Sequence, residues 1–144
     1  FRMVPGLENA EFVRYGVIHR NTYLDAPQAL NPDLSLKGAE RIFVAGQLTG
    51  VEGYVESAAM GIYVGLNVLA RIQGKESTPP SRASALGSLV SHLQDSTERE
   101  FAPMNINWGL FPEPIEPARD KGVKRAKKIE SAQAAFAEWK AQLG

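Results

Sequence analysis

The chain has 144 residues and contains no cysteine. This absence excludes disulfides, thiolate metal sites and a cysteine nucleophile within these residues. Histidine is nearly absent too, because the sequence has two, His19 and His92, far apart along the chain. We therefore expect no bound metal.

The sequence also lacks an excess of charge and a targeting segment. The formal net charge is zero, so no global attraction to nucleic acid is expected. Five charged residues within the first twenty leave no apolar core for a signal peptide. The most apolar stretch, residues 55–72, contains Glu56, Asn67 and Arg71 and is expected to be too short and polar to span a bilayer. We expect a cytoplasmic protein with no membrane partner.

What the chain does have is one glycine-rich segment between a predicted strand and a predicted helix. Residues 42–45 form a short apolar run, typical of a strand covered on both faces. Gly46, Gly50 and Gly53 permit tight turning and close backbone approach, and the helix that follows directs its N-terminal N–H groups at the turn. From the chemistry alone, a nucleotide or flavin site and a plain turn without a ligand are equally favoured.

The amino-acid sequence of residues 46–59, GQLTGVEGYVESAA, narrows the choice between a ligand site and a plain turn. This closely resembles the C-terminal flavin-contacting segment of the folate- and FAD-dependent tRNA (uracil-5-)-methyltransferases, known as TrmFO. The related GidA-type enzymes of wobble-uridine modification carry a similar loop, closer to Gly-Gln-x-Asn-Gly-Thr-Thr-Gly-Tyr-Glu-Glu. Residues 51–52 and 55–57 of this chain favour the methyltransferase.

The resemblance implies how much of such an enzyme is present. The chain starts at Phe1, and residues 4–12 match an interior segment of the family, so we expect a C-terminal fragment of a longer polypeptide. The family's N-terminal dinucleotide fingerprint and catalytic cysteines are absent here. We therefore expect no catalytic residue in this chain, cysteines upstream of it, and a fragment that is inactive alone.

The implied fold is α/β, part of a split Rossmann-like FAD-binding domain followed by C-terminal helices. The implied reaction forms 5-methyluridine in the T-loop of tRNA from 5,10-methylenetetrahydrofolate, using FAD and NAD(P)H. Its partners would be tRNA and the remainder of the same polypeptide. The residues expected to contact the flavin are Gly46, Gln47, Gly50, Gly53, Tyr54 and Val55. We also expect Gly53→Val to lower flavin occupancy, because a branched Cβ would block the backbone's approach.

Two further segments resemble the same family. Residues 15–23, YGVIHRNTY, imply a folate or substrate site made by His19, Arg20 and Asn21 together with Tyr54. The alternative is a half-exposed strand whose polar side chains are solvated. Residues 103–112, PMNINWGLFP, could supply amides and Trp108 to a base, or could simply form turns and pack.

The tail is the third candidate region, because residues 118–144 carry seven Lys/Arg against three Asp/Glu. A basic helix face can contact RNA phosphates, and Lys124, Arg125 and Lys128 are the candidates for tRNA. The alternative is a solvated face above a buried stripe. That stripe would consist of Ile129, Ala132, Phe136, Trp139 and Leu143.

The pattern of apolar residues and turn formers divides the chain into three parts. Residues 1–74 would complete the FAD-binding domain, with strands in 11–23, a brief strand at 34–36 and a helix from 54 to 73 ending at Gly74. A polar linker would occupy 75–81. Residues 82–144 would form a helical extension, with Ser81 or Ser84 capping a helix at 82–95 and an irregular loop at 101–117.

Two alternatives to the methyltransferase stay open at this point. One is a GidA-type flavoenzyme, from which the product nucleoside would separate it. The other is a non-catalytic RNA-binding or interaction module that keeps the turn without a ligand. Retention of flavin by the longer polypeptide would argue against that module.

Overall fold

The structure, a computed structural model, describes residues 1–11, 21–95, 101–114 and 120–143. The described elements are α1 (Ala26–Ala29), β1 (Ser35–Leu36), β2 (Ala39–Phe43), the 3-10 helix η1 (Gly46–Thr49), α2 (Tyr54–Ile72), α3 (Ala85–Leu93) and α4 (Lys121–Gln142). The predicted α/β class is confirmed in its coarse form. The strands expected in 11–23 fall largely outside the described residues.

The sheet within the described residues has two antiparallel strands, β1 and β2, with an irregular register between Ser35 and Leu36. Both strands were predicted, and of the run 42–45 that was expected to be covered on both faces, Val44 is buried, Phe43 and Ala45 are half-buried and Ile42 is exposed. Residues 39–42 are exposed, and Ile42 is 54% exposed. A strand buried on both faces needs neighbours on each side, and the described part of the chain does not supply them.

Helix α2 is the main support of the fold and matches the predicted helix. It ends before Gly74, whose φ of 67° is the left-handed conformation favoured after a helix. One face enters the core through Met60, Tyr63 and Asn67. The Asn67 amide donates to the Asp33 carbonyl at 2.9 Å, and the Tyr63 hydroxyl donates to the Pro32 carbonyl at 3.2 Å. These bonds fix α2 to the segment before β1.

By length and composition alone, α2 is long and apolar enough to cross a membrane, so the expectation that it is too short and polar was wrong. A core helix of a water-soluble fold passes the same test. What sets α2 apart is that only 17% of its most apolar window is buried. Val64 and Leu66 are partly buried against the core, whereas Ile62, Leu69 and Ile72 are at least half exposed.

The other two long helices are capped by side chains, as their sequences suggest. The Ser84 hydroxyl accepts a hydrogen bond from the Gly87 N–H at 3.0 Å, which confirms one of the two predicted caps for α3. The Asp120 carboxylate accepts from the Val123 N–H at 2.9 Å at the start of α4. Of the buried stripe predicted for α4, Trp139 alone is buried.

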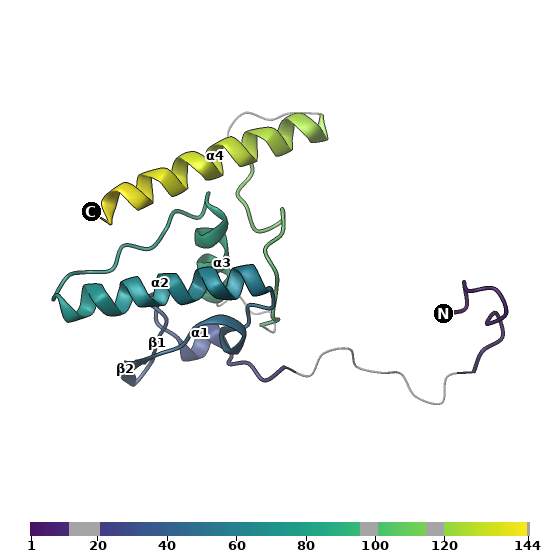
Figure 1. Ribbon diagram of the computed structural model, residues 1–144, viewed down its shortest axis with the longest axis horizontal. Coiled ribbons are helices and arrows are strands. Elements are labelled where there is room, and N and C mark those ends of the chain that lie inside the picture. The colour runs from purple at the N-terminus through teal and green to yellow at the C-terminus, as the bar shows by residue number, and fades with distance from the viewer. Residues whose placement is uncertain (12–20, 96–100, 115–119, 144) are drawn as a thin grey trace.

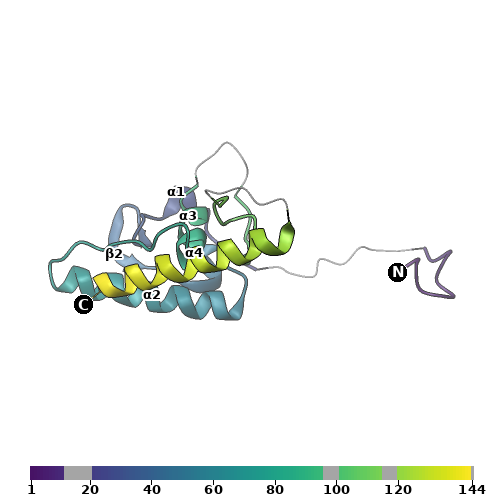
Figure 2. The same cartoon turned by 90° about the horizontal axis from the view of Figure 1, so that it is seen from above.

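One hydrophobic core joins both sides of the predicted linker. It includes Leu30 and Leu34 before α2, Leu89 and Leu93 of α3, and Trp139 of α4. The Trp139 indole N–H donates to the Thr78 carbonyl at 2.7 Å, so the 75–81 segment anchors the end of α4. Helix α3 lies between α2 and α4 in Figure 1, and Figure 2 shows α4 running over α2.

Candidate functional site

The glycine-rich segment forms a tight turn between β2 and α2. Gly46 and Gly50 have φ of 69° and 93°, a region that side chains disfavour, so two of the three predicted glycines are needed for the turn itself. A Cβ on Gly46 would lie 3.4 Å from Ser57, and one on Gly50 would lie 2.6 Å from the Phe101 ring. The space above these glycines is thus occupied by side chains of the same chain.

Gly53 has a different role from its neighbours. Its φ is −75°, which any residue can adopt, and a Cβ there would lie 1.8 Å from a Glu56 carboxylate oxygen. The same carboxylate accepts a hydrogen bond from the Ile106 N–H at 3.4 Å. A side chain at position 53 would therefore first displace Glu56, a contact that the sequence analysis did not foresee.

The N-terminus of α2 has backbone N–H groups with no hydrogen-bond acceptor among the described residues. Its N-cap, Gly53, supplies no side-chain oxygen, whereas α3 and α4 each have a side-chain cap. The N–H groups of Tyr54, Val55 and Glu56 donate to none of the described residues, and the first bond of the helix runs from Ser57 to Gly53 at 2.8 Å. Free N–H groups at a helix start are suited to an acceptor ligand.

The side chains beside these donors are uncovered. Tyr54 is 97% exposed and Val55 is 81% exposed. Aromatic and branched apolar side chains exposed to this extent at a helix start contribute nothing to the core of the described residues. They are available to a ligand or to another part of a protein.

The structure brings the 103–112 run to the glycine loop. Val51 and Met104 form a parallel bridge, in which the Met104 N–H donates to the Gly50 carbonyl at 2.9 Å. Together with the Glu56 contact to Ile106, this bridge holds the two segments side by side. Two motifs separated by about fifty residues in the sequence are therefore parts of one site.

The 15–23 segment reaches the same place at its C-terminal end. Asn21 is half-buried, and three residues later the Leu24 N–H donates to the Leu48 carbonyl of the glycine loop at 2.9 Å. The Tyr23 and Phe101 rings meet edge to face, 6.2 Å apart. His19 and Arg20 lie outside the described residues, so their predicted roles are untested.

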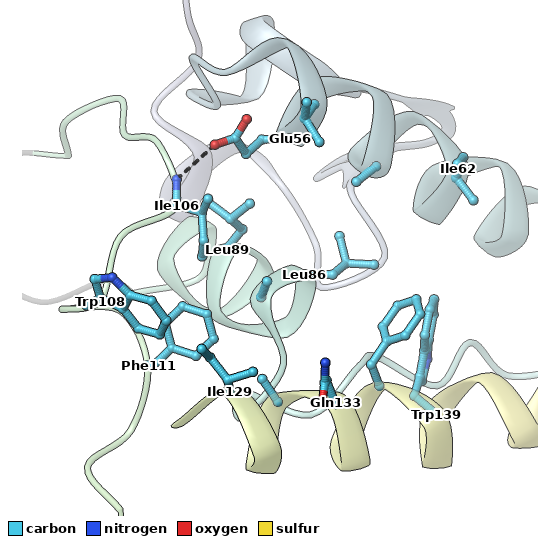
Figure 3. A pocket seen from close by; sticks show the side chains of 15 residues that line it. Glu56, Ile62, Leu86, Leu89, Ile106, Trp108, Phe111, Ile129, Gln133 and Trp139 are labelled. Carbon is cyan, nitrogen blue, oxygen red and sulfur yellow. Dashed lines mark hydrogen bonds between the residues drawn. The ribbon is translucent and has the colours of Figure 1, made fainter. Parts of the chain in front are cut away.

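An apolar groove of about 730 Å³ opens beside the start of α2 (Figure 3). It lies between α2, α3, α4 and the 106–111 segment. Glu56 and Gln133 are its polar lining residues, and the others are aliphatic or aromatic. Four rings line this aromatic groove: Trp108, Phe111, Phe136 and Trp139. Such a surface suits a flat or apolar group more than a charged one.

The tail holds the 108–113 segment in place through a buried lysine. Lys128 is 8% exposed, and its ammonium donates to the Trp108 carbonyl at 3.0 Å and to a Glu113 oxygen at 3.2 Å. Hydrogen bonds from Lys124 and Lys128 lower the pKa of the Glu113 carboxyl below its ordinary value. Lys128 is thus directed into the protein and Lys124 is paired with Glu113.

Arg125 differs from these two lysines because its side chain lies on the surface. It is exposed, and its guanidinium carbon lies 5.3 Å from the centre of the Trp108 ring. Trp108 is itself 40% exposed and packs against Phe111. A cation stacked on an exposed ring forms a platform on which a base can stack. Within the described residues, no group of three metal-ligating side chains occurs.

Sequence reasoning missed three residues that assemble the site: Glu56, Phe101 and Met104. A local signal existed for one of them, because a glutamate three residues after an N-cap is a common partner of a helix start. Phe101 and Met104 act through contacts with residues about fifty positions away. No periodicity or motif in one short window reveals such pairs.

Comparison with known proteins gives two consistent results. The family described as glucose inhibited division protein A matches residues 1–76. Methylenetetrahydrofolate–tRNA-(uracil-5-)-methyltransferase TrmFO of Oleidesulfovibrio alaskensis is 52% identical over 143 residues, which cover 99% of this chain and 32% of that protein. The TrmFO proteins of Geobacter sulfurreducens and Nitratidesulfovibrio vulgaris Hildenborough are 49% and 50% identical over 99% and 100% of this chain.

These matches confirm the predicted resemblance to the TrmFO proteins. The chain spans about a third of the length of the curated relatives that it matches. The similarity extends through the 103–112 run and the tail, whereas the family match ends at residue 76.

Proposed function

The chain belongs to the glucose inhibited division protein A family, and we propose that it forms one wall of an FAD site in a longer polypeptide. The observation that supports this most is the uncapped start of α2, where three N–H groups without partners among the described residues adjoin exposed Tyr54. This arrangement fits an electron-rich ligand with a flat ring. The finer fold, a split Rossmann-like FAD-binding domain, is part of the same proposal.

Individual roles follow from where each residue lies in the turn. Gly46 and Gly50 shape the turn, Gly53 leaves room for Glu56, and Gln47, Tyr54 and Val55 face outward at its rim. The bound FAD would supply the redox chemistry, while the protein orients it and excludes competing reactions. The backbone N–H groups of residues 54–56 would donate to its acceptor atoms.

The reaction proposed for the whole polypeptide is the formation of 5-methyluridine in the T-loop of tRNA. 5,10-Methylenetetrahydrofolate would supply the one-carbon unit, NAD(P)H the electrons, and cysteines outside this chain the catalytic thiols. The names of relatives about half identical to this chain support the substrate and the reaction. We propose that His19, Arg20, Asn21 and Tyr54 line the folate and uridine side of the site, in a cytoplasmic enzyme.

The decisive experiment uses the full-length polypeptide that contains this chain. Unmodified tRNA is incubated with it, 5,10-methylenetetrahydrofolate, FAD and NADPH, then digested to nucleosides and measured by mass spectrometry. We expect 5-methyluridine, and we expect its loss when the folate is left out. The appearance of 5-methyluridine without folate would contradict the proposed carbon source. No modified nucleoside and no bound flavin would favour a binding module.

One alternative enzyme has a specific observation in its favour. The family match to residues 1–76 fits a GidA-type enzyme of wobble-uridine modification as well. A folate-dependent adduct at the wobble uridine, in the same nucleoside experiment, would support it. The match of the TrmFO relatives over the 103–112 run and the tail favours the methyltransferase.

The tail is proposed to contact tRNA phosphates through Lys124, Arg125 and Lys128. Their positions suggest that the three residues have different roles in RNA binding. Arg125 offers an exposed charge beside the Trp108 ring, and Lys124 is half-buried against Glu113. Lys128 would act indirectly, by holding the 108–113 segment under that platform. Base stacking on Trp108 would add sequence-tolerant affinity to the phosphate contacts.

Replacing Arg125 by alanine is expected to weaken tRNA binding by the full-length polypeptide. One lost phosphate contact lowers the slope of log affinity against log salt concentration by about 1. Filter binding or fluorescence anisotropy over a salt series measures this slope. The matched control is Lys140→Ala, an equal loss of charge about 22 Å further along α4. Equal slopes in both variants would contradict a local contact at Arg125.

A further inference from the structure

His92 lies in the last turn of α3, is half-buried, and contacts the 101–104 segment in two ways. Its Nε2 atom lies 3.1 Å from the Ala102 carbonyl oxygen, and because a carbonyl can only accept, Nε2 is the donor. The ring also packs on Phe101, with the two ring centres 5.4 Å apart and their planes inclined at 31°. His92 therefore fixes the backbone of one residue and the side chain of its neighbour.

Phe101 connects this histidine to the proposed flavin site. Its ring lies so close to Gly50 that an added Cβ there would be 2.6 Å from the Phe101 Cζ atom. The same ring meets the Tyr23 ring edge to face, with 6.2 Å between the centres. Gly50 belongs to the glycine loop, and Tyr23 ends the 15–23 segment that is proposed to line the folate side. One ring therefore contacts both halves of the proposed site.

Among the described residues, an isolated bridge joins the backbone of the 101–104 segment to the glycine loop. The Met104 N–H donates to the Gly50 carbonyl at 2.9 Å, and the Glu52 N–H donates to the Met104 carbonyl at the longer distance of 3.4 Å. A short pairing of two strands is marginally stable without further packing. The side-chain contacts of Phe101 are thus needed to fix this segment against the loop.

Helix α3 gives that contact a rigid base. Its first turn is capped by Ser84, and the buried Gly87 lies against the backbone of residues 80–81. Leu89 and Leu93 anchor the helix in the core. A side chain on a well-packed helix is placed more precisely than one on a loop. His92 can therefore hold the 101–104 segment, whereas that segment could not hold itself.

We propose that His92 is a positioning residue for the flavin: it holds Phe101 against Gly50, and so sets the conformation of the loop that orients the free N–H groups at the start of α2. The hydrogen bond to Ala102 fixes the backbone beside Phe101, and the ring contact fixes its side chain. His92 acts through Phe101 and not by touching the flavin. This inference rests on the proposed function, because it takes the glycine loop as part of the flavin site.

A double-mutant cycle in the full-length polypeptide tests whether His92 acts through Phe101. Flavin dissociation constants are measured by fluorescence titration for His92→Ala, Phe101→Ala and the double variant. We expect His92→Ala to loosen flavin binding about fivefold, the effect of one ordinary hydrogen bond. The double variant should bind no more weakly than Phe101→Ala alone, because the two residues act in series. Losses that multiply in the double variant would overturn the proposal.

Two further variants separate positioning from a general loss of stability. His92→Gln keeps an amide donor where Nε2 lies, so we expect flavin affinity within about twofold of the unsubstituted protein. Gln94→Ala removes a hydrogen bond of 3.2 Å from the same end of α3 to the Asn31 carbonyl, away from Phe101. It should lower the urea midpoint comparably to His92→Ala and leave flavin affinity within about twofold. No rescue by His92→Gln, or an equal flavin loss in Gln94→Ala, would contradict the proposal.

Hydrogen exchange distinguishes a failure of this inference from a failure of the proposed function. The N–H groups of Glu52 and Met104 donate across the bridge, and their exchange is measured by mass spectrometry of peptides from the full-length polypeptide without added flavin. We expect about fivefold faster exchange in His92→Ala and no change in Gln94→Ala. Unchanged exchange in His92→Ala would overturn the inference. Faster exchange in a polypeptide that binds no flavin would refute the proposed function and leave His92 as the residue that holds the loop.

Discussion

Replacing Gly87 by alanine should destabilise this part of the protein by about 3 kcal/mol or more, although alanine is the better helix former. Gly87 is buried in the first turn of α3. A Cβ there would lie 2.0 Å from the Ser81 carbonyl oxygen and 2.5 Å from that of Pro80. Both atoms belong to the backbone, so no side chain can swing aside to make room.

The clash is severe because the same turn is fixed from two directions. The Ser84 hydroxyl donates to the Ser81 carbonyl at 2.8 Å while accepting from the Gly87 N–H. Moving residue 81 to admit a methyl group would break the cap of α3, at a further cost of about 1 kcal/mol. Around it, α3 supplies Leu89 and Leu93 to the core, so a shifted α3 would also disturb packing against α2.

Urea denaturation and thermal melting of the full-length polypeptide, followed by circular dichroism, measure this loss. The control is Ser91→Ala on the same helix, a half-buried position, where a change within about 0.5 kcal/mol is expected. If Gly87→Ala were as stable as the control, the close approach of residues 80–81 to α3 would be wrong.

Local sequence signals predicted the helices well because the forces that start and stop a helix act within a few residues. Ser84 precedes an apolar 3.6-residue repeat and caps α3, and Gly74 follows α2 in the left-handed conformation. In the tail, α4 begins after Asp120, whose carboxylate accepts a hydrogen bond from the Val123 N–H. Each of these signals is complete within one turn of helix.

The burial of individual residues was harder to predict, because it depends on which distant segments of the chain pack against them. The apolar run at 42–45 favoured a strand covered on both faces, yet Ile42 is half exposed. On α4 the predicted stripe included Ile129 and Phe136, which are each 44% exposed, while Lys128 is buried. A lysine is buried there because two carbonyls and a carboxylate accept its hydrogen bonds, and no local pattern reveals them.

The site was predicted as separate pieces, and its assembly could not be. The glycine loop, the 103–112 run and Asn21 were each identified from the local sequence. Nothing in the sequence predicts that Val51 pairs with Met104, or that Leu24 hydrogen-bonds to Leu48. Such pairings form between residues far apart in the chain and depend on the whole fold. The structure turns three motifs into neighbours, which is why a substitution in one should affect a ligand bound at another.

Replacing Gly50 by alanine should loosen flavin binding by the full-length polypeptide about tenfold or more. The residue has a φ of 93°, where a side chain costs about 1–2 kcal/mol, and a factor of ten in affinity corresponds to about 1.4 kcal/mol. Its Cβ would also lie 2.6 Å from the Phe101 ring. Relieving either strain moves the turn that aims α2, and the free N–H groups of residues 54–56 move with it.

The comparison that isolates this effect uses Gly53 and Phe101. Gly53→Ala has an ordinary φ and meets only the end of the flexible Glu56 side chain, so we expect flavin affinity within about threefold of the parent. Gly53→Val demands more room and should fall between the two. Phe101→Ala combined with Gly50→Ala removes the clash but keeps the backbone strain, so affinity should recover in part. Flavin dissociation constants from fluorescence titration rank the four variants. Full flavin retention by Gly50→Ala, or a larger loss at Gly53→Ala, would show that the turn does not position the flavin, because only Gly50 has both the left-handed backbone and the rigid neighbour.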